Sequence, residues 1–260
     1  MRPSFYISRE ITLRTELKNY IGKADSLGYI IPDYTGRIAL NTLIIAMANC
    51  GFWQTQDLIL NLGFNNTECN EIGFINMKKV TDPLAVAYGG LTYEANGYLG
   101  NAIDGYIDTN YNASTYGGNY TTYDCGRGII VYKTGVGLFG KISSGNMDRL
   151  LNNNSISHCI NTNGFLTSKA DMRGTGLKSI NRIGGYDVVL YNKNIELIRN
   201  QWVYGVTNDN DDIFYSGYVG YSNAGGSIYW AGGSNSNSMT QSFRTAYNTY
   251  LTSIGLLPIA

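Results

Sequence analysis

The stretch GYLGNAIDGYIDTN, Gly97–Asn110, lies where the composition of this 260-residue chain changes. It reads as a turn followed by a short strand that ends in Tyr-Ile-Asp-Thr. Of 22 tyrosines, 18 lie at or after Tyr88, and of 32 glycines, 26 lie at or after Gly89. No proline falls between Pro83 and Pro258. Because proline interrupts the hydrogen bonding of a sheet, this pattern predicts a mostly helical leader followed by a long β-rich body.

Two segments of the leader carry apolar residues at helical intervals. They are Arg9–Ala24 and, with the stronger pattern, Asp33–Asn49, which Gly51 can end. Gln54–Asn61 is expected to add one or two helical turns. Residues 1–85 are therefore predicted to form a helical region that serves attachment and oligomerisation.

From Leu91 onward, short runs rich in Tyr, Ile and Val alternate with Gly, Asn and Ser clusters. The predicted strands are Leu91–Ala95, Tyr106–Thr109, Gly128–Lys133, Gly137–Ser143, Ile156–Asn161, Tyr186–Asn192, Ile195–Asn200, Ile213–Gly220 and Ser227–Ala231. Many short strands with turns between them favour a sandwich or jelly roll.

Two local patterns complete this body. The strands on either side of Lys193-Asn194 are expected to form a β-hairpin. Ser238–Ser253 returns to a helical pattern that Gly255 can end. Residues 86–260 are therefore predicted to be one β domain with a C-terminal helix.

Several motifs follow one another along residues 20–255. They are LNTLIIAMANCGFW at Leu40–Trp53, Asp57-Leu58-Ile59, the N-x-K element Asn76–Lys78, Tyr106-Ile107-Asp108-Thr109, Asn112-Ala113-Ser114, Ser179–Asn200 and the closing helix Ser238–Gly255. Their order resembles a family of bacteriophage structural proteins from tailed phages, including crAss-like phages of gut Bacteroidetes. The family has Gly-Ile-Trp and Asn-Pro-Ser where this chain carries Phe52 and Ala113 in place of the isoleucine and the proline.

The resemblance implies a mainly β fold: a concanavalin A-like (LamG-like) antiparallel β-sandwich jelly roll preceded by an N-terminal helical segment. It also implies a virion component, such as a head or tail fibre, made in the cytoplasm of the bacterial host. The partners that it implies are other virion proteins and copies of the chain itself. A trimer is the first expectation.

Charged residues make up only 15% of the chain, hydrophobic residues make up 43%, and the formal net charge is zero. Nucleic-acid binding usually leaves a basic stripe, and none is visible, so no nucleic-acid partner is expected. The low charge favours association. The longest apolar stretch, Leu43–Ala48, is too short to span a bilayer. The four separated cysteines are expected to remain free thiols.

Candidate catalytic groups are few. His158 is the sole histidine and is interpreted as structural. Glycoside hydrolysis needs two carboxylates that face one cleft, and Asp104 and Asp108 are the nearest pair. We expect instead that Asp104 forms a turn with Gly105 and that Asp108 accepts backbone N–H groups at a strand end. No catalytic residue is predicted.

The densest acidic patch is Asn208–Asp212. Calcium prefers such clusters of oxygen ligands, but the EF-hand pattern is absent, and a solvated turn is the first interpretation. If calcium binds, its expected ligands are Asp209, Asp211 and Asp212. No other cofactor is expected.

Tyrosines crowd two regions that are rich in small polar residues, where aromatic faces could stack sugars or form protein interfaces. The candidate ligand-binding residues are Tyr111, Tyr116, Tyr120, Tyr123, Tyr215, Tyr218, Tyr221 and Trp230. Trp53, just after the leader helix, is expected to anchor the leader on the sandwich or to dock a partner.

These observations predict a non-enzymatic virion structural protein that acts by assembly and by adhesion to the host surface. One alternative is a carbohydrate-binding module for a host surface glycan. Another is a glycan-degrading enzyme that uses Asp104 and Asp108.

Overall fold

A computed structural model describes residues 12–121, 123–135, 138–139, 147–151, 154–155, 159–162, 170–183, 187–193, 195–201 and 223–259. In these residues the chain is mostly antiparallel β-sheet with a few helices, an arrangement consistent with a β-sandwich. The β-rich body that the tyrosine and glycine distribution predicted is therefore present.

The described helices near the two ends of the chain are α1 (Thr15–Ser26), α2 (Tyr34–Asn49), α3 (Phe52–Thr55) and α5 (Asn237–Ser253). Between them lie a 3-10 helix at Thr67–Phe74 and the short α4 (Ala113–Tyr116). Asp33 caps α2, since its carboxylate accepts a 2.8 Å hydrogen bond from the Gly36 N–H. Gly51, with a φ of 84°, follows the end of α2, as predicted.

One eight-stranded sheet, here called the main sheet, organises the fold. Its strands are β14 (Ile195–Gln201), β13 (Asp187–Asn192), β12 (Gly176–Ile183), β6 (Cys125–Lys133), β15 (Gly225–Gly232), β4 (Gly97–Leu99) and β3 (Thr92–Glu94), in that order, with β1 (Gln56–Asn61) also paired to β15. Antiparallel pairing of β13 with β14 confirms the predicted hairpin.

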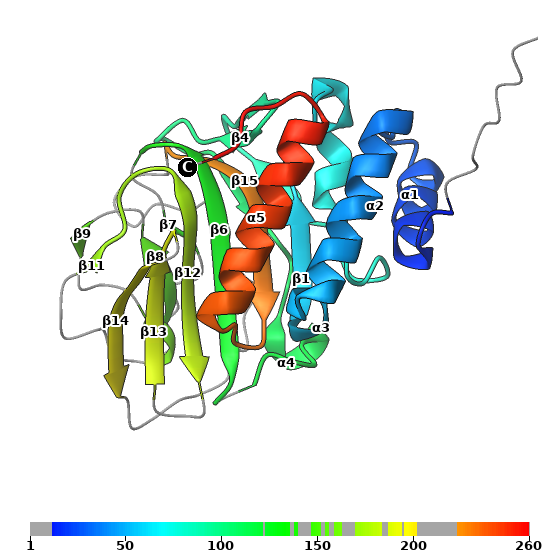
Figure 1. Ribbon diagram of the computed structural model, residues 1–260. Helices are drawn as coiled ribbons and strands as arrows, with labels where there is room; N and C mark the ends of the chain where they lie inside the picture. The colour runs from blue at the N-terminus through cyan, green and yellow to red at the C-terminus, as the bar shows by residue number, and fades with distance from the viewer. Residues whose placement is uncertain are drawn as a thin grey trace, which may run out of the picture.

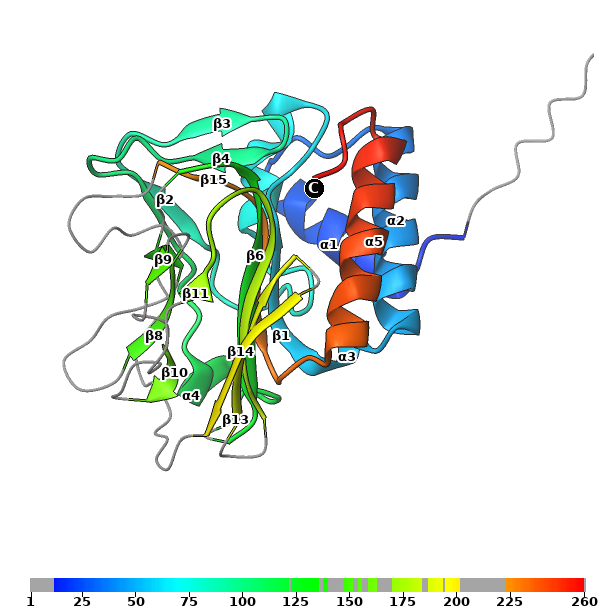
Figure 2. The same ribbon diagram turned by 60° about the vertical axis from the view of Figure 1, so that its left-hand side comes forward.

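Smaller sheets lie on one face of the main sheet, and α1, α2 and α5 lie on the other (Figures 1 and 2). The small sheets pair β2 (Val86–Tyr88) with β5 (Tyr106–Asp108), β9 (Asn154–Ser155) with β11 (Ala170–Asp171), and β8 (Met147–Leu151) with β7 (Leu138–Phe139) and β10 (Cys159–Thr162).

Each face of the main sheet has its own hydrophobic core. The core on the helical side contains Ile59, Ile228 and Trp230 together with buried residues of α1, α2 and α5. The core on the opposite side contains their strand neighbours, such as Leu58 and Tyr229, together with Ile107 of β5. This division follows from the alternation of side chains along a strand.

The prediction of helix over Gln54–Asn61 is wrong beyond Thr55. Gln56–Asn61 is instead the strand β1, which pairs with β15 and is buried at every position. In a segment as short as QDLILN, which is buried throughout, periodicity alone does not decide between helix and strand. Because β1 belongs to the main sheet, the boundary predicted at residue 85 runs through one sheet.

On the edge of β1 that faces away from β15, a side chain forms hydrogen bonds with the backbone N–H and C=O groups. Asn76 accepts a 3.1 Å hydrogen bond from the Ile59 N–H and donates a 2.8 Å bond to the Asp57 carbonyl. Its amide thus takes the place of a neighbouring strand. The N-x-K element that the sequence singled out therefore has a structural role, because Lys78 also donates to the Trp53 carbonyl at 2.5 Å.

The cysteine side chains that the structure describes, Cys50, Cys69 and Cys125, are free thiols. Among the described residues, none of the helices combines the length and the hydrophobicity that crossing a lipid bilayer requires.

Candidate interaction surfaces

The outer surface formed by α2 and α5 carries few charged side chains. The exposed residues of α5 are Ser238, Gln241, Ser242, Thr245, Thr249, Thr252 and Ser253. Arg244 and Arg37 are the sole charged residues of α5 and α2, and both are half-buried. Solvent-facing helix positions usually carry strong helix formers such as Lys and Glu, whereas Ser and Thr cost several tenths of a kcal/mol each relative to Ala.

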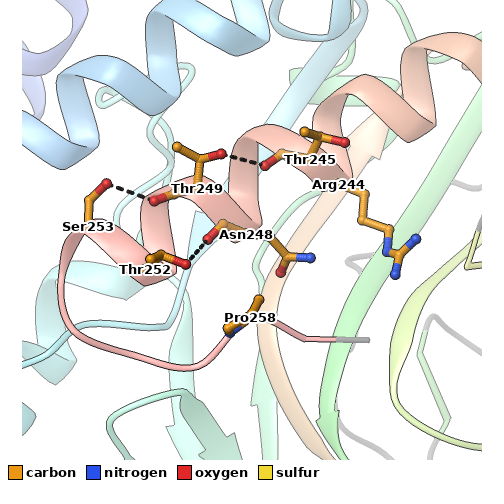
Figure 3. Close-up of a pocket in the computed structure, with 7 residues that line it drawn as sticks. All are labelled: Arg244, Thr245, Asn248, Thr249, Thr252, Ser253 and Pro258. Carbon is orange, nitrogen blue, oxygen red and sulfur yellow. Dashed lines mark hydrogen bonds between the residues drawn. The ribbon is translucent and has the colours of Figure 1, made fainter.

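The threonine hydroxyls of this surface bond to their own helices. Thr249 Oγ1 donates to the Thr245 carbonyl at 3.0 Å, and Thr252 Oγ1 donates to the Asn248 carbonyl at 2.9 Å (Figure 3). On α2, Thr42 Oγ1 bonds to the Ile38 carbonyl at 3.0 Å. Because these donors are used within the helix, the surface offers fewer free polar groups than its composition suggests.

Two hollows interrupt this surface. The first, here called the α2–α5 hollow, has a volume of about 310 Å³ and is lined by Tyr34, Thr35, Ile38, Ala39, Thr42 and Ser253. The second has a volume of about 500 Å³ and is lined by Arg244, Thr245, Asn248, Thr249, Thr252, Ser253 and Pro258 (Figure 3). The α2–α5 hollow has no ionisable lining group except the Tyr34 phenol.

A second surface lies on the opposite side of the main sheet, at the loop between β4 and β5. In this Asn101 loop, residues 101–105, the Asn101 Oδ1 accepts hydrogen bonds from three successive backbone N–H groups. Those of Ile103, Asp104 and Gly105 lie 2.9, 3.1 and 3.0 Å away. Such an Asx arrangement fixes the backbone locally.

Asp104 fastens the Asn101 loop to a neighbouring turn. Its Oδ1 accepts from Asn101 Nδ2 at 2.7 Å and from the Gly90 N–H at 2.9 Å. These two bonds, that from Asn101 first, hold the pKa of the Asp104 carboxyl below its usual value. The carboxylate of Asp104 is therefore a structural acceptor in the predicted turn, and Asp108 likewise accepts from the Asn110 N–H at 2.9 Å.

The two turns approach so closely that only glycine fits. A Cβ on Gly89, which has a φ of 66°, would lie 2.2 Å from the Asp104 carbonyl oxygen, and one on Gly90 would lie 2.2 Å from Asn101 Nδ2. Ala102 adopts the left-handed region with a φ of 61°, which costs a non-glycine residue free energy. The Asn101 loop is therefore held in one conformation by its surroundings.

Exposed apolar side chains lie at the tip of this loop and on strand β2. Ile103 at its tip is 73% exposed, and Tyr88 and Val86 of β2 are 44% and 38% exposed. The Tyr88 ring stacks on Tyr106 of β5 at a centroid distance of 4.8 Å. The sequence analysis predicted the turn at Asp104 and Gly105 but not the exposed tip at Ile103. The Asn-x-x-Asp-Gly spacing is typical of such a loop and could have predicted it.

The candidate tyrosines are placed differently from one another. Tyr111, Tyr120 and Trp230, which the sequence analysis expected on a binding surface, are buried. Tyr111 Oη donates to Asp57 Oδ2 at 3.3 Å, and the Tyr120 N–H donates to the same oxygen at 2.8 Å. This corrects the expectation for the three side chains, because a ligand could not stack on rings that the core already covers.

The remaining aromatic candidates lie nearer the surface or outside the described residues. Tyr116 is half-buried, with Lys79 Nζ 5.9 Å from its ring. Tyr123 is 57% exposed, with the Arg182 Cζ 5.8 Å from its ring centroid. Outside the described residues lie Tyr215, Tyr218, Tyr221, Asp209, Asp211, Asp212 and His158.

Trp53 packs into the core on the helical side, with Lys78 Nζ 5.2 Å from its ring centroid. This position suits an anchor between the leader and the main sheet. Within the part of the chain that the structure describes, no cluster of three or more His, Cys, Asp or Glu side chains could hold a metal ion. The calcium site at residues 209–212 stays a prediction.

No protein family model matches the sequence, and no curated protein matches it. Among solved structures, the binding domain of Paraclostridial Mosquitocidal Protein 1 is similar to this chain, with a TM-score of 0.38 and 10% sequence identity. The match covers 75% of this chain and 53% of that one, about half its length. At this TM-score the similarity is too low to carry an argument about fold or function.

Proposed function

We propose that this chain is a non-enzymatic structural component of a bacteriophage particle that acts through protein–protein contacts. The supporting observation is the outer face of α5, where the exposed residues are neutral from Ser238 to Ser253. The cores of protein interfaces are depleted of charged residues, and a face that stays in water would gain helix stability from Lys and Glu.

The sequence resemblance indicates where in the phage particle such a chain would lie. A concanavalin A-like jelly roll in a head fibre, a tail fibre or another exposed part would be present in many copies. Other virion proteins and further copies of the chain would be its partners. Contacts that are individually weak then add up through effective concentration.

The test is whether the chain is part of the particle. Mass spectrometry and antibody labelling of purified particles from the phage that encodes it should find it at a fixed position. A chain that is abundant in the infected cell but absent from purified particles would contradict the proposal.

A charged variant tests the observation itself. The double substitution Thr245→Glu and Thr249→Glu places two carboxylates on the neutral face and should reduce incorporation into particles at least tenfold. Ile195→Glu, a change at an exposed position of β14, is the matched control and should leave incorporation unchanged. Equal incorporation of both variants would remove the helical face from the proposal.

Carbohydrate binding is the second candidate, favoured by the 57% exposed ring of Tyr123. Aromatic rings stack on sugars. Tyr123→Ala should then abolish binding to a host surface glycan on an array, with the buried Tyr120→Phe as the control that keeps the fold. An unaltered signal in Tyr123→Ala would eliminate this candidate.

A further inference from the structure

Lys178 of β12 has an environment that is unusual for a lysine, because the residue is buried. Its Nζ donates to the Arg173 carbonyl at 3.1 Å and to Oδ1 of Asn192. Burial, with the nearby charge of Lys193, lowers the pKa of the Lys178 ammonium to about 8, whereas the charge of Asp171 opposes this shift. A large fraction of the amine is therefore neutral near pH 8, and a neutral amine is a nucleophile.

The carboxamide of Asn192 lies within reach of this amine. Lys178 and Asn192 are directly paired across β12 and β13, and the Cβ atoms of such a pair lie on one face of the sheet, about 5 Å apart. A second contact orients the carboxamide, because its Nδ2 donates to the Asp171 carbonyl at 2.8 Å. The electrophilic Cγ lies one C=O bond, about 1.2 Å, beyond the oxygen that accepts from Nζ. The sheet thus holds an amine beside an amide carbon.

We propose that Lys178 Nζ slowly attacks Asn192 Cγ in the folded chain, so that an isopeptide bond joins β12 to β13. The Nζ–Cγ bond forms and the Cγ–Nδ2 bond breaks. One proton of the neutral amine passes to Nδ2, which leaves as ammonia. The reaction exchanges one amide for another, so it consumes no oxidant, reductant or cofactor. This inference is independent of the proposed function.

The geometry and the charges of the site determine the rate. An amine attacks a carbonyl carbon through the face of the amide, so the Asn192 carboxamide must first leave its two hydrogen bonds. The reaction is therefore slower than folding, and freshly purified chain retains the Lys178 amine. The Arg173 guanidinium lowers the pKa of Asp171 to about 2, so Asp171 stays ionised above pH 6. Because the rate follows the neutral fraction of the amine, it should be about 100-fold higher at pH 9 than at pH 6.

The bond has two consequences for the aged chain. It closes a covalent ring through residues 178–192 and restricts the unfolded chain, which stabilises the fold as a disulfide does. It also converts the Lys178 amine into an amide that no longer binds a proton. The pH dependence of stability that this amine causes in fresh chain is therefore lost as the bond forms.

The experiment is mass spectrometry of the purified full chain during incubation at pH 9 and at pH 6. The wild type should lose one ammonia molecule per chain at pH 9, and about 100-fold more slowly at pH 6. Lys178→Met keeps the bulk of the side chain without the amine and should lose none from this site. Lys133→Met, at an exposed position of β6, is the matched control and should react as the wild type does. A wild type that forms no bond over weeks at pH 9 would overturn the proposal.

Peptide mapping separates this bond from the loss of ammonia at Asn-Gly sequences, which begin at Asn96 and Asn163. Trypsin should release Gly174–Arg182 joined to Ile183–Lys193 from the incubated wild type, and the same two peptides unjoined from Lys178→Met. Hydroxylamine cleaves the cyclic imides that form at Asn-Gly sequences but leaves an isopeptide bond intact. A loss of ammonia that maps to an Asn-Gly sequence, without the joined peptide, would overturn the proposal.

Discussion

The two faces of the main sheet are buried by different chemistry. On the helical side, Trp230 packs edge-on against Phe52 and Phe243 at centroid distances of 5.5 and 5.1 Å, within an aliphatic and aromatic core. On the opposite side, Arg127, Lys178 and Arg182 are almost completely buried on the same strand faces as Ile129 and Ile180. Buried hydrogen bonds occur on the helical side as well, where Tyr247 donates to Asn61 and Asn61 donates to Tyr250, both at 3.1 Å. What sets the opposite face apart is its buried cationic side chains.

The two sides also differ at the surface. The outer surface of α2 and α5 on the helical side carries few charged side chains, whereas the opposite side combines buried cationic side chains with the rigid Asn101 loop. Charged side chains are almost never fully buried unless they have partners. Mutations on the two sides should therefore differ in size and in their dependence on pH.

The largest effect is expected on the helical side. Trp230→Ala removes the ring that Phe52 and Phe243 contact and should lower the free energy of unfolding by about 3–5 kcal/mol. Urea denaturation followed by circular dichroism measures it, and Trp230→Phe, which keeps an aromatic ring, should lose much less. Equal losses for both variants would contradict the role given to ring size.

The next largest loss of stability is expected at Asp57, a buried carboxylate that accepts several hydrogen bonds on the opposite side of the main sheet. Asp57 accepts from the Asn119 N–H at 2.9 Å and from the Tyr120 N–H at 2.8 Å. Asp57→Ala leaves these donors without their acceptor and should cost about 2–3 kcal/mol. Asp57→Asn keeps one acceptor oxygen and should cost less in the same urea titration. If Asp57→Ala lost less free energy of unfolding than an exposed substitution such as Asp25→Ala, the hydrogen bonds of Asp57 would not hold the segment at Asn119 and Tyr120 in place.

A third, smaller effect depends on pH. Burial, with the nearby charge of Lys193, lowers the pKa of Lys178 to about 8 in the folded chain, against an ordinary value of 10.5. Between these two values the unfolded chain binds more protons than the folded one, so stability should rise with pH. The rise between pH 8 and 9 is on the order of 1 kcal/mol.

Lys178→Met tests this origin. The variant should be more stable than the wild type at pH 7, and it should lack this rise between pH 8 and 9 in thermal or urea denaturation. Measurements stop near pH 9 because burial raises the pKa of Cys69, Tyr247 and Tyr250 in the folded chain, and stability falls with pH as these groups ionise in the unfolded chain. A wild-type curve without a rise would refute the assignment.

The smallest effect concerns the outer face of α5. Thr249→Ala should raise the free energy of unfolding by a few tenths of a kcal/mol, because alanine is the better helix former at an exposed position. Thr240→Ala is the contrast, since Thr240 is buried and bonds to the Ser236 carbonyl at 2.8 Å, and it should destabilise. A loss of stability in Thr249→Ala would mean that the threonine serves the isolated fold rather than a partner.

The sequence predicted correctly those elements whose structure depends on residues close together in the chain. The helices α2 and α5 and the hairpin of β13 and β14 carry their caps, glycines and periodicity within their own segments. β1 was predicted as helix because its pairing with β15 joins residues that are far apart in sequence.

Burial of the tyrosines could not be predicted for the same reason. Tyr111 and Tyr123 have similar polar neighbours in sequence, yet the first reaches Asp57 across 54 positions and the second stays exposed. The neutral face of α5 could have been recognised, because its pattern of Ser and Thr without Lys or Glu is visible in the sequence once the helix is assigned.

In the Asn101 loop, the side chains that hold the backbone differ from the side chain that the loop exposes. Its shape depends on the side chains of Asn101 and Asp104 and on the absence of a Cβ at Gly89 and Gly90, so position 103 carries no duty in maintaining it. Substitution of Ile103 should therefore change the surface that the loop presents while the scaffold stays intact. Variation among natural versions of the chain should therefore concentrate at the tip and spare the residues beneath it.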